Sequence, residues 1–183
     1  MPDRLDKIVT RGGDGGETSL GDGTRVAKSD PRVALMGDID ELNSCIGVVL
    51  AMAPGEVVTE TLIGVQHDLF DLGGALCFPG APLLSEAHVG RLDDAAAALN
   101  EDLAPLKDFI LPGGAPLIAH AHVARTVCRR VERAAAVFLK DDAGGHALRY
   151  LNRLSDYLFI AARFEAKRLG VAETLWRKQY SLS

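Results

Sequence analysis

The chain has 183 residues and is 48% hydrophobic, which suits one domain with a substantial buried core. Its net charge of −5 argues against a nucleic-acid partner, so a basic cluster within it indicates a local site for an anion. No stretch has the pattern of a signal peptide or a membrane span, and the three cysteines lie far apart without metal-ligand spacing. The sequence therefore predicts a cytoplasmic protein with reduced thiols and no membrane partner.

Residues 10–23 are rich in glycine, which excludes a regular helix and leaves two interpretations. One is a flexible leader. The other is a loop whose backbone N–H groups form an anion nest, with the hydroxyls of Thr18 and Ser19 as further donors and Lys28 within reach. The segment lacks the Gly-Lys-Ser/Thr ending of a P-loop, so it does not by itself decide between the two.

Apolar residues recur at steps of three and four along most of the chain, which is the period of helices that bury one face. Asp30-Pro31 is typical of a helix start, and Ser85 is a typical cap for a later helix. The predicted elements are a short extended piece at Ile8-Val9, helices over 32–53, 57–76 and 85–103, an arginine-rich helix containing 125–133, a turn over 141–145 and a helix over 146–169.

Short connections between these helices predict an all-α, up-and-down five-helix bundle. The chain divides into an N-terminal segment (1–31), the bundle (32–169) and a C-terminal tail (170–183), which together form one domain. The tail shows no pattern and is expected to be partly disordered. The paired Glu-x-x-His motif of the di-iron bundle enzymes is absent, which excludes the commonest catalytic use of this architecture.

Acidic side chains cluster on the first helix at Asp38, Asp40 and Glu41. They can compensate the helix dipole, pair with arginines or act as outer-shell metal ligands, and the sequence leaves these three roles open. On the second helix, His67 lies beside Asp68 with no second histidine at helical spacing. We therefore expect a surface or capping pair there rather than metal ligands.

The arginine-rich helix carries the most informative pattern of the chain. Arg125, Arg129 and Arg133 recur at four-residue steps with Glu132 beside them, so these side chains share one face. Most charge runs are solvated faces paired with carboxylates. Here only Glu132 is close in sequence, and stacked guanidinium groups repel one another unless an anion lies across them, which favours a phosphate site.

A strongly apolar loop, Phe109-Ile110-Leu111-Pro112-Gly113-Gly114, leads into this helix. Exposed Phe, Ile and Leu side chains are unfavourable unless a core or a ligand covers them. The loop is therefore either a plug for the end of the bundle, which the physics alone favours, or part of an apolar ligand site.

Several of these stretches, taken in order, resemble the PduO-type ATP:cob(I)alamin adenosyltransferases. The resemblance covers about residues 7–169. No single motif is specific to this family, but the set of motifs in this order is. The motifs are Thr10-Arg11, Gly13-Asp14, Gly16, Thr18-Ser19-Leu20, Lys28-Ser29-Asp30-Pro31-Arg32-Val33, Asp40-Glu41-Leu42-Asn43-Ser44, the loop 109–114, the helix 125–133 and Tyr150-Leu151-Asn152-Arg153-Leu154-Ser155-Asp156-Tyr157.

The resemblance implies a homotrimer with active sites between subunits, in which the glycine-rich loop of one subunit and the arginine helix of the next hold ATP. The residues implied as ATP contacts are Thr10, Arg11, Gly12, Gly13, Asp14, Thr18, Ser19, Lys28, Arg129, Arg130, Glu132, Arg133 and Asn152. Asp40 and Arg125 match a salt bridge across the subunit interface. Phe109 matches an aromatic side chain that closes the lower face of the corrin ring, next to Leu111. Arg129, Arg125, Phe109 and Asp40 are thus the implied catalytic group.

The implied reaction joins C5′ of ATP to the cobalt of cob(I)alamin and releases triphosphate, with Mg²⁺ bound to the phosphates. Since cobalt(I) is the nucleophile, no Ser, Cys or His nucleophile is required. The resemblance also implies a corrinoid reductase and a cobalamin-dependent mutase as partners. Three alternatives remain open: a nucleotide-binding regulator, a purely structural trimer and a corrinoid chaperone.

The glycine-rich loop departs from the family pattern. Relatives often have Thr-Gly-Asp-Lys-Gly where this chain has Gly12-Gly13-Asp14-Gly15-Gly16, so a hydroxyl and a lysine are missing. We expect Lys28 and the arginines to compensate, with weaker ATP binding, and we expect the loop to be disordered until ATP binds.

Overall fold

The computed structural model describes residues 9–78, 81, 84–139 and 145–180. Ile8 of the predicted extended piece and most of the turn predicted at 141–145 lie outside these residues. The described elements are β1 (Glu17–Ser19), β2 (Arg25–Ala27), α1 (Pro31–Ala51), α2 (Glu56–Cys77), α3 (Glu86–Glu101), α4 (Pro116–Phe138) and α5 (His146–Arg168).

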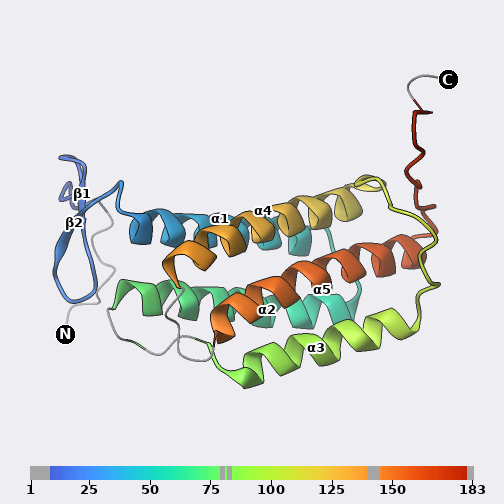
Figure 1. The fold of residues 1–183 in the computed structure, drawn as a ribbon, viewed down its shortest axis with the longest axis horizontal. Coiled ribbons are helices and arrows are strands. Elements are labelled where there is room, and N and C mark those ends of the chain that lie inside the picture. Colours follow the sequence, from blue (N-terminus) through green and yellow to red (C-terminus); the bar gives the residue numbers. More distant parts are fainter. Residues whose placement is uncertain (1–8, 79–80, 82–83, 140–144, 181–183) are drawn as a thin grey trace.

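The helices lie side by side along the long axis of the molecule, and successive helices run in opposite directions (Figure 1). The helix α4 packs against both α1 and α5, while α3 packs on α5 and α2 packs on α1. The predicted all-α, up-and-down five-helix bundle is therefore confirmed.

The helices begin where local chemistry favours a start. At α1, the Asp30 carboxylate accepts a hydrogen bond of 2.8 Å from the backbone N–H of Arg32, and Pro31 occupies the first turn, where its missing N–H is harmless. At α3, the backbone N–H of Ser85 donates to Nδ1 of His88 at 3.1 Å. Both starts fall within about a residue of their predicted positions, since capping depends on neighbouring residues alone.

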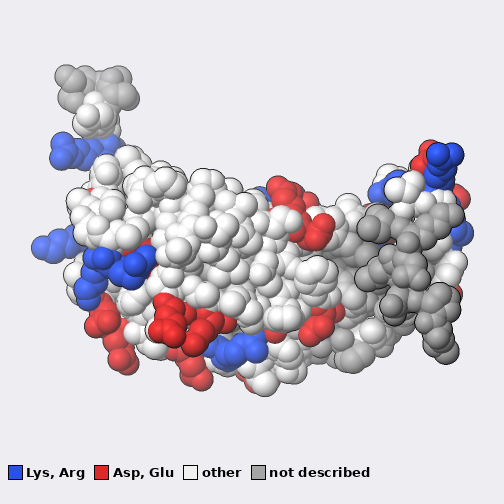
Figure 2. All heavy atoms as spheres, turned by 180° about the vertical axis from the view of Figure 1, so that it is seen from behind, with Lys and Arg blue, Asp and Glu red and all other residues white. Residues whose placement is uncertain are grey.

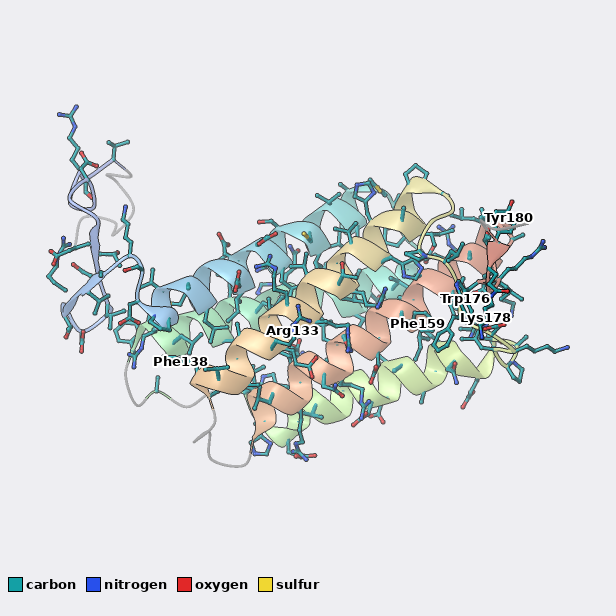
Figure 3. The ribbon with its side chains drawn as sticks, turned by 45° about the horizontal axis from the view of Figure 1, so that its top comes forward. Arg133, Phe138, Phe159, Trp176, Lys178 and Tyr180 are labelled. Atoms are coloured by element: carbon teal, nitrogen blue, oxygen red, sulfur yellow. The ribbon has the colours of Figure 1, made fainter. Side chains whose placement is uncertain are left out.

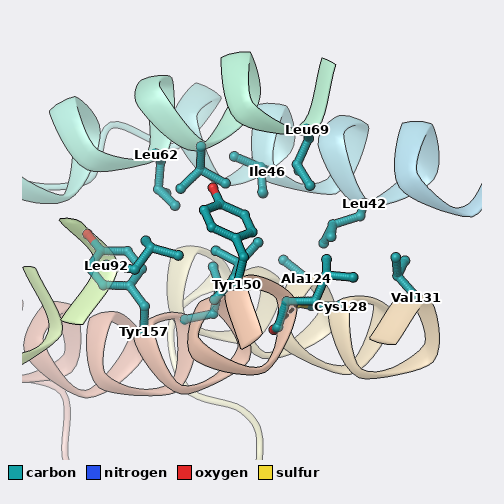
Figure 4. Close-up of a cluster of buried hydrophobic side chains, with 14 of the residues drawn as sticks. Leu42, Ile46, Leu62, Leu69, Leu92, Ala124, Cys128, Val131, Tyr150 and Tyr157 are labelled. Carbon is teal, nitrogen blue, oxygen red and sulfur yellow. Dashed lines mark hydrogen bonds between the residues drawn. The ribbon is translucent and has the colours of Figure 1, made fainter. Parts of the chain in front are cut away.

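The core is built from the apolar stripes of the helices, with Tyr150 and Tyr157 of α5 fully buried at its centre (Figure 4). The Tyr150 hydroxyl donates to Asp68 of α2 at 2.6 Å, and Asp68 also pairs with Arg91 of α3. Asp68 is only 4% exposed, so the expected surface pair at His67-Asp68 is wrong for Asp68, although His67 is exposed. Two donors from other helices make burial of this carboxylate tolerable.

The glycine-rich segment contains β1, which forms an antiparallel hairpin with β2 directly after the segment, whereas the sequence predicted only a loop at 10–23. The hairpin lies at the end of the bundle where α1 begins (Figure 1). Its turn is attached to the C-terminal end of α2, since Leu20 is buried and the N–H of Gly21 donates to the carbonyl of Cys77 at 2.8 Å. The ring of Phe78 lies directly against Gly21, which leaves no room for a side chain there.

The segment after α5 pairs with the apolar loop that precedes α4. The backbone N–H of Leu111 donates to Thr174 at 2.8 Å, and that of Trp176 donates to Phe109 at 2.7 Å. The nearly buried Arg163 of α5 holds the same segment through Glu173 at 2.8 Å. Residues 171–176 of the tail, for which the sequence shows no pattern, are therefore held by α5 and by the loop before α4, so partial disorder of the tail does not extend to them.

Candidate active site

Three arginines of α4 form a row on successive turns and have no carboxylate partner among the residues that the structure describes. Arg125, Arg129 and Arg133 share one face, as predicted, and the described part of the chain contains no ion pair to any of them. Arg133 instead donates through Nη1 to the carbonyl of Arg129 at 2.9 Å (Figure 3 labels Arg133). An uncompensated row of this kind suits a polyanion such as triphosphate.

Arg130 lies on a different face of α4 and is engaged within the chain. It pairs with Asp38 and Glu41 of α1, and the bond to Glu41, the larger cause, together with these charges raises its pKa above the ordinary arginine value. Two of the three acidic residues on α1 are therefore arginine partners, while Asp40 is exposed. Arg130, which was predicted as an ATP contact, is already paired with two carboxylates in this chain, unlike the three arginines of the row, and this pairing does not suit that role.

A surface cavity of about 440 Å³ lies beside the row, between α3, α4 and α5. Its lining residues are Asp93, Ala96, Arg125, Arg129, Arg153, Ser155, Asp156, Phe159 and Ile160. Arg153 is paired with Asp93 and Asp156, so Arg125 and Arg129 are the cations of the lining that have no carboxylate among the described residues. About one turn beyond Arg129 on α4, Glu132 accepts a hydrogen bond of 3.0 Å from Asn152 of α5. This bond joins two of the predicted ATP contacts.

Arg125 contacts two rings, and its surroundings destabilise its charged form. Its guanidinium carbon lies 6.0 Å from the centre of the Phe159 ring, and its Nε–H donates to Nδ1 of His122 at 3.4 Å. Partial burial, and secondly the charge of Arg129, lower the Arg125 pKa. A cation in this state gains more than a solvated one from an approaching carboxylate or phosphate.

His122 is a site residue that the sequence reasoning missed. It is 5% exposed, and burial and then the charge of Arg125 lower its pKa below the ordinary histidine value. A neutral ring can accept the Arg125 N–H, whereas a protonated one cannot. Its position one helical turn before Arg125 was the available signal.

Phe109 is 76% exposed and makes an edge-on contact with Trp176, with ring centroids 6.5 Å apart. Next to it is a cavity of about 480 Å³, which is lined by residues 106–110 together with His122, Arg125 and Phe159. The cavities beside Phe109 and beside the arginine row thus share Arg125 and Phe159. Leu111 is 46% exposed and belongs to the same apolar loop. The interpretation of this loop as a simple plug does not fit these exposures.

The glycine-rich segment forms a compact turn before β1. The N–H of Asp14 donates to Arg11 at 3.3 Å, and that of Gly16 donates to Gly13 at 3.2 Å. Lys28 closes the turn, since its own N–H donates to Gly16 at 2.9 Å and its ammonium lies against Gly13, where an added Cβ would be 3.0 Å from Nζ. The segment is therefore folded, in contrast to the flexible leader that was one of the two interpretations.

Within the residues that the structure describes, no acceptor is bound to the backbone N–H groups of Gly13 and Gly15. Thr10 precedes the turn, and Thr18 and Ser19 are the last two residues of β1. Together with the Lys28 ammonium, these donors have the chemistry of an anion nest.

One chain alone does not bring all the predicted residues together. The hairpin projects at the end of the bundle where α1 begins (Figure 1), whereas Arg125 and Arg129, which line the cavity, lie in the middle turns of α4. Seen from behind, most Lys and Arg side chains lie near the two ends, and much of the middle is uncharged (Figure 2).

The described residues contain no cluster of three or more His, Cys, Asp or Glu side chains that could hold a metal ion. In the same part of the chain, no helix has the length and apolar character needed to cross a membrane.

The comparisons with known proteins agree with one another. Residues 8–165 match the model of a family described as "Cobalamin adenosyltransferase". A cobalamin adenosyltransferase of Cupriavidus metallidurans is 49% identical, with 98% of each chain covered, and a corrinoid adenosyltransferase of Mycobacterium leprae is 42% identical, with 89% of this chain and 93% of that one covered.

A solved structure of a variant PduO-type ATP:corrinoid adenosyltransferase from Lactobacillus reuteri, complexed with cobalamin and ATP, has a TM-score of 0.87 at 33% identity. The match covers 94% of this chain and 100% of that one. Fold, sequence and the arrangement of arginines beside an exposed aromatic loop thus agree, and the chain belongs to the cobalamin adenosyltransferase family.

Proposed function

We propose that this chain transfers the 5′-deoxyadenosyl group of ATP to cob(I)alamin, forming adenosylcobalamin and releasing triphosphate. The observation that carries the proposal is that Arg129 and Arg133 have no carboxylate partner among the described residues and lie next to Arg125, which lines both the cavity beside the row and the cavity beside the exposed Phe109 loop. Polyanion binding and apolar ring binding are the two recognition tasks of this reaction. Membership in the family and the relatives' names support the same activity.

The triphosphate is assigned to two groups of donors. Arg129 and Arg133 neutralise the negative charge that grows as triphosphate departs, and Asn152 with Glu132 orients this face. The nest of residues 10–16, with Lys28 over it, supplies the other donors, and Thr18 and Ser19 add hydroxyls. The positive charge and the planar guanidinium groups of the arginines compensate for the lysine that relatives often have at the position of Gly15.

Mg²⁺ is assigned to the phosphates rather than to a protein cage, since the described residues contain no cluster of carboxylate or histidine ligands. This mode suits the ion, which often keeps its waters and binds substrate phosphates with one or two carboxylates. The exposed Asp14 of the turn is the candidate carboxylate.

The corrin is assigned to the apolar side of the site. Cobalt(I) of the corrinoid substrate supplies the nucleophile, and the protein holds C5′ in line with it and excludes water. Phe109 and Leu111 cover the lower face of the ring, which keeps the lower axial position free of a donor. Their exposure in the free chain is the expected state of a surface that a large flat ligand covers.

A homotrimer with sites between subunits reconciles the positions of the parts. The hairpin lies beyond one end of the bundle, while Arg133 of the row lies further along α4 (Figure 3), so a neighbouring chain can receive the hairpin. Asp40 is exposed and Arg125 has no carboxylate partner among the described residues, which suits a salt bridge between them across the interface. We further propose a cytoplasmic location, a corrinoid reductase as electron donor and a cobalamin-dependent mutase as recipient.

The test is an anaerobic assay with protein, ATP, Mg²⁺ and chemically reduced cob(I)alamin, in which the absorbance change reports the cobalt–carbon bond. Catalytic formation of adenosylcobalamin with one triphosphate per turnover is expected. ATP binding without any spectral change would favour a regulatory protein. Binding of neither ligand, seen as no thermal shift, would indicate a structural trimer, and corrinoid binding without need of ATP would indicate a chaperone.

The role of Phe109 has its own prediction. The variant Phe109→Ala should impair reduction of cobalt(II) in the presence of the protein, because the lower ligand is no longer excluded. It should spare turnover of preformed cob(I)alamin, which carries no such ligand. Parallel assays with cob(II)alamin plus reductant and with cob(I)alamin measure the two steps, and equal loss in both would refute the assignment.

A further inference from the structure

Arg25 of β2 reaches back across the hairpin to the glycine-rich turn, and neither the motifs nor the reaction assigns it a role. Its Nη2–H donates to the carbonyl of Gly12 at 3.0 Å, and its Nη1–H donates to Ser19 Oγ at 3.3 Å. A weaker ion pair joins Nη2 to Glu17 at 3.4 Å, between side chains that are 43% and 58% exposed. The guanidinium fork thus connects the turn with both ends of β1.

The contact with Gly12 determines the direction of a neighbouring donor. The carbonyl of Gly12 and the N–H of Gly13 belong to one planar trans peptide, in which the two groups point in opposite directions. When Arg25 binds the carbonyl, the N–H of Gly13 must point away from the guanidinium. This N–H has no acceptor among the described residues, and the Lys28 ammonium lies against the same glycine.

Glycine gives this peptide no conformational preference of its own. Gly12 and Gly13 lack a Cβ, so their peptide plane can rotate through many orientations unless an external group holds it. The preceding Arg11 already has a φ of 58°, a conformation that non-glycine residues adopt only when their surroundings impose it. The guanidinium of Arg25 is well suited to hold the Gly12–Gly13 peptide in one orientation, since its donors are rigidly oriented.

We propose that Arg25 is a positioning residue that locks the Gly12–Gly13 peptide so that the Gly13 N–H presents itself to an anion, the triphosphate of ATP. Arg25 acts from the far side of the peptide and does not itself contact the phosphates. This inference rests on the proposed function for the identity of the anion. It goes beyond that function because it concerns how the turn is held before any ligand binds.

The primary measurement is ATP affinity by calorimetry, which does not depend on turnover. Arg25→Ala should weaken ATP binding about tenfold, the loss of roughly one charge-assisted hydrogen bond. In steady state, the KM for ATP should rise by a similar factor, while the KM for the corrinoid and the melting temperature of the bundle stay unchanged. Added methylguanidinium should restore part of the affinity of Arg25→Ala, compared with sodium at equal ionic strength.

The matched control is Glu17→Gln, which removes the exposed ion pair of Arg25 but leaves the contacts to Gly12 and Ser19. Its ATP affinity should equal that of the wild type. Equal losses in Glu17→Gln and Arg25→Ala would mean that general charge pairing of the hairpin matters, and would overturn the proposal. Unchanged affinity in Arg25→Ala would overturn it as well.

A measurement without ATP separates positioning from direct contact. Trypsin cleaves after Arg11, within the turn, and cleavage of the intact hairpin requires that the turn opens. Arg25→Ala should be cut at Arg11 several-fold faster than the wild type in the absence of nucleotide. Lower ATP affinity with unchanged cleavage would indicate a direct phosphate contact and refute positioning.

These outcomes are distinguishable from failure of the proposed function. A wild-type protein that binds ATP but forms no adenosylcobalamin would refute the reaction, while the affinity comparison would still test Arg25. A wild-type protein that does not bind ATP would overturn both.

Discussion

Arg129 and Arg130 of α4 have different roles, although they are adjacent in the sequence. Arg130 points toward α1 and is satisfied by Asp38 and Glu41, whereas Arg129 faces the cavity without a carboxylate in the described part of the chain. Helical geometry alone separates them, since adjacent residues on a helix point about 100° apart. The sequence could predict the row at four-residue steps, but the partners of Arg130 become evident only when α1 and α4 are packed.

This difference predicts opposite consequences of alanine substitution. Arg129→Ala should lower kcat/KM by about a hundredfold or more, the effect of removing one donor from a developing charge, and leave the assembly and the melting temperature unchanged. Arg130→Ala should lower the free energy of unfolding by about 1 kcal/mol, because its ion pairs are partly exposed. Kinetics of triphosphate release and denaturant unfolding of both variants measure this. Similar kinetic losses in the two variants would contradict the division of duties.

His122 makes stability depend on pH on the acid side. Its pKa in the folded protein lies below the ordinary value of 6.5 that the unfolded chain has, so the unfolded state binds more protons between the two values. The stability that depends on neutral His122 is therefore fully present above pH 6.5 and is lost as the pH falls through the folded pKa. Urea unfolding of the wild type and of His122→Gln at pH 7 and pH 5 tests this. A stability difference between the two proteins that stays constant over this range would contradict it.

At the scale of elements, three helices meet at one buried carboxylate. Asp68 of α2 accepts from Tyr150 of α5 and pairs with Arg91 of α3. Burial, and secondly the charge of Asp68, raise the pKa of Tyr150 well above its ordinary value, so the hydroxyl remains a donor. This network supplies polar specificity among otherwise apolar helix faces.

Removing the two partners should have unequal effects on stability. Asp68→Ala should lower the free energy of unfolding by about 3 kcal/mol, because it leaves the Tyr150 hydroxyl buried without its acceptor. Tyr150→Phe should lower it by about 1 kcal/mol, since Asp68 retains Arg91. Denaturant titration of both variants provides the comparison. A larger effect of Tyr150→Phe would mean that Arg91 alone does not satisfy the buried Asp68 carboxylate, and would contradict this ranking.

The elements differ in how far the sequence could predict them. Helices α1 and α3 could be predicted with their starts, because periodicity and caps are local signals. The burial of Asp68 and the pairing of residues 110–111 with 174–175 could not, because each depends on a partner distant in the sequence. The hairpin is a different case, since its two strands are close in sequence. Gly21-Asp22-Gly23 between short alternating stretches was a hairpin signal that could have been used. Within the site, the arginines and Phe109 could be predicted, whereas His122 and Arg25 needed the structure.

At the scale of the whole molecule, the separation of hairpin and arginine row within one chain predicts complementation between chains. Lys28→Ala should inactivate the nest, and Arg129→Ala should inactivate the row. In mixed trimers, an intact nest of one variant meets an intact row of the other, so a fraction of the sites is complete.

The measurement is activity after refolding the two inactive variants together. Recovery of a substantial fraction of wild-type activity is expected, and light scattering should give a mass of three chains. Two copies of the same variant refolded together are the control and should stay inactive. A monomeric mass, or no recovery in mixtures shown to contain both chains, would contradict sites shared between subunits.

The pairing between the Phe109 loop and the segment after α5 also bears on how the protein is made. A ribosome releases the N-terminal parts of a chain first, and α5 ends at Arg168, before Thr174 and Trp176 supply the partners of the loop. A product of premature termination near Gly170 would contain every described helix but would lack Thr174 and Trp176, whose backbones hold the Phe109 loop. Cellular proteases, which degrade unfolded chains, would not recognise such a product as unfolded. Completion of the site is thus a later event in the life of the chain than completion of the fold.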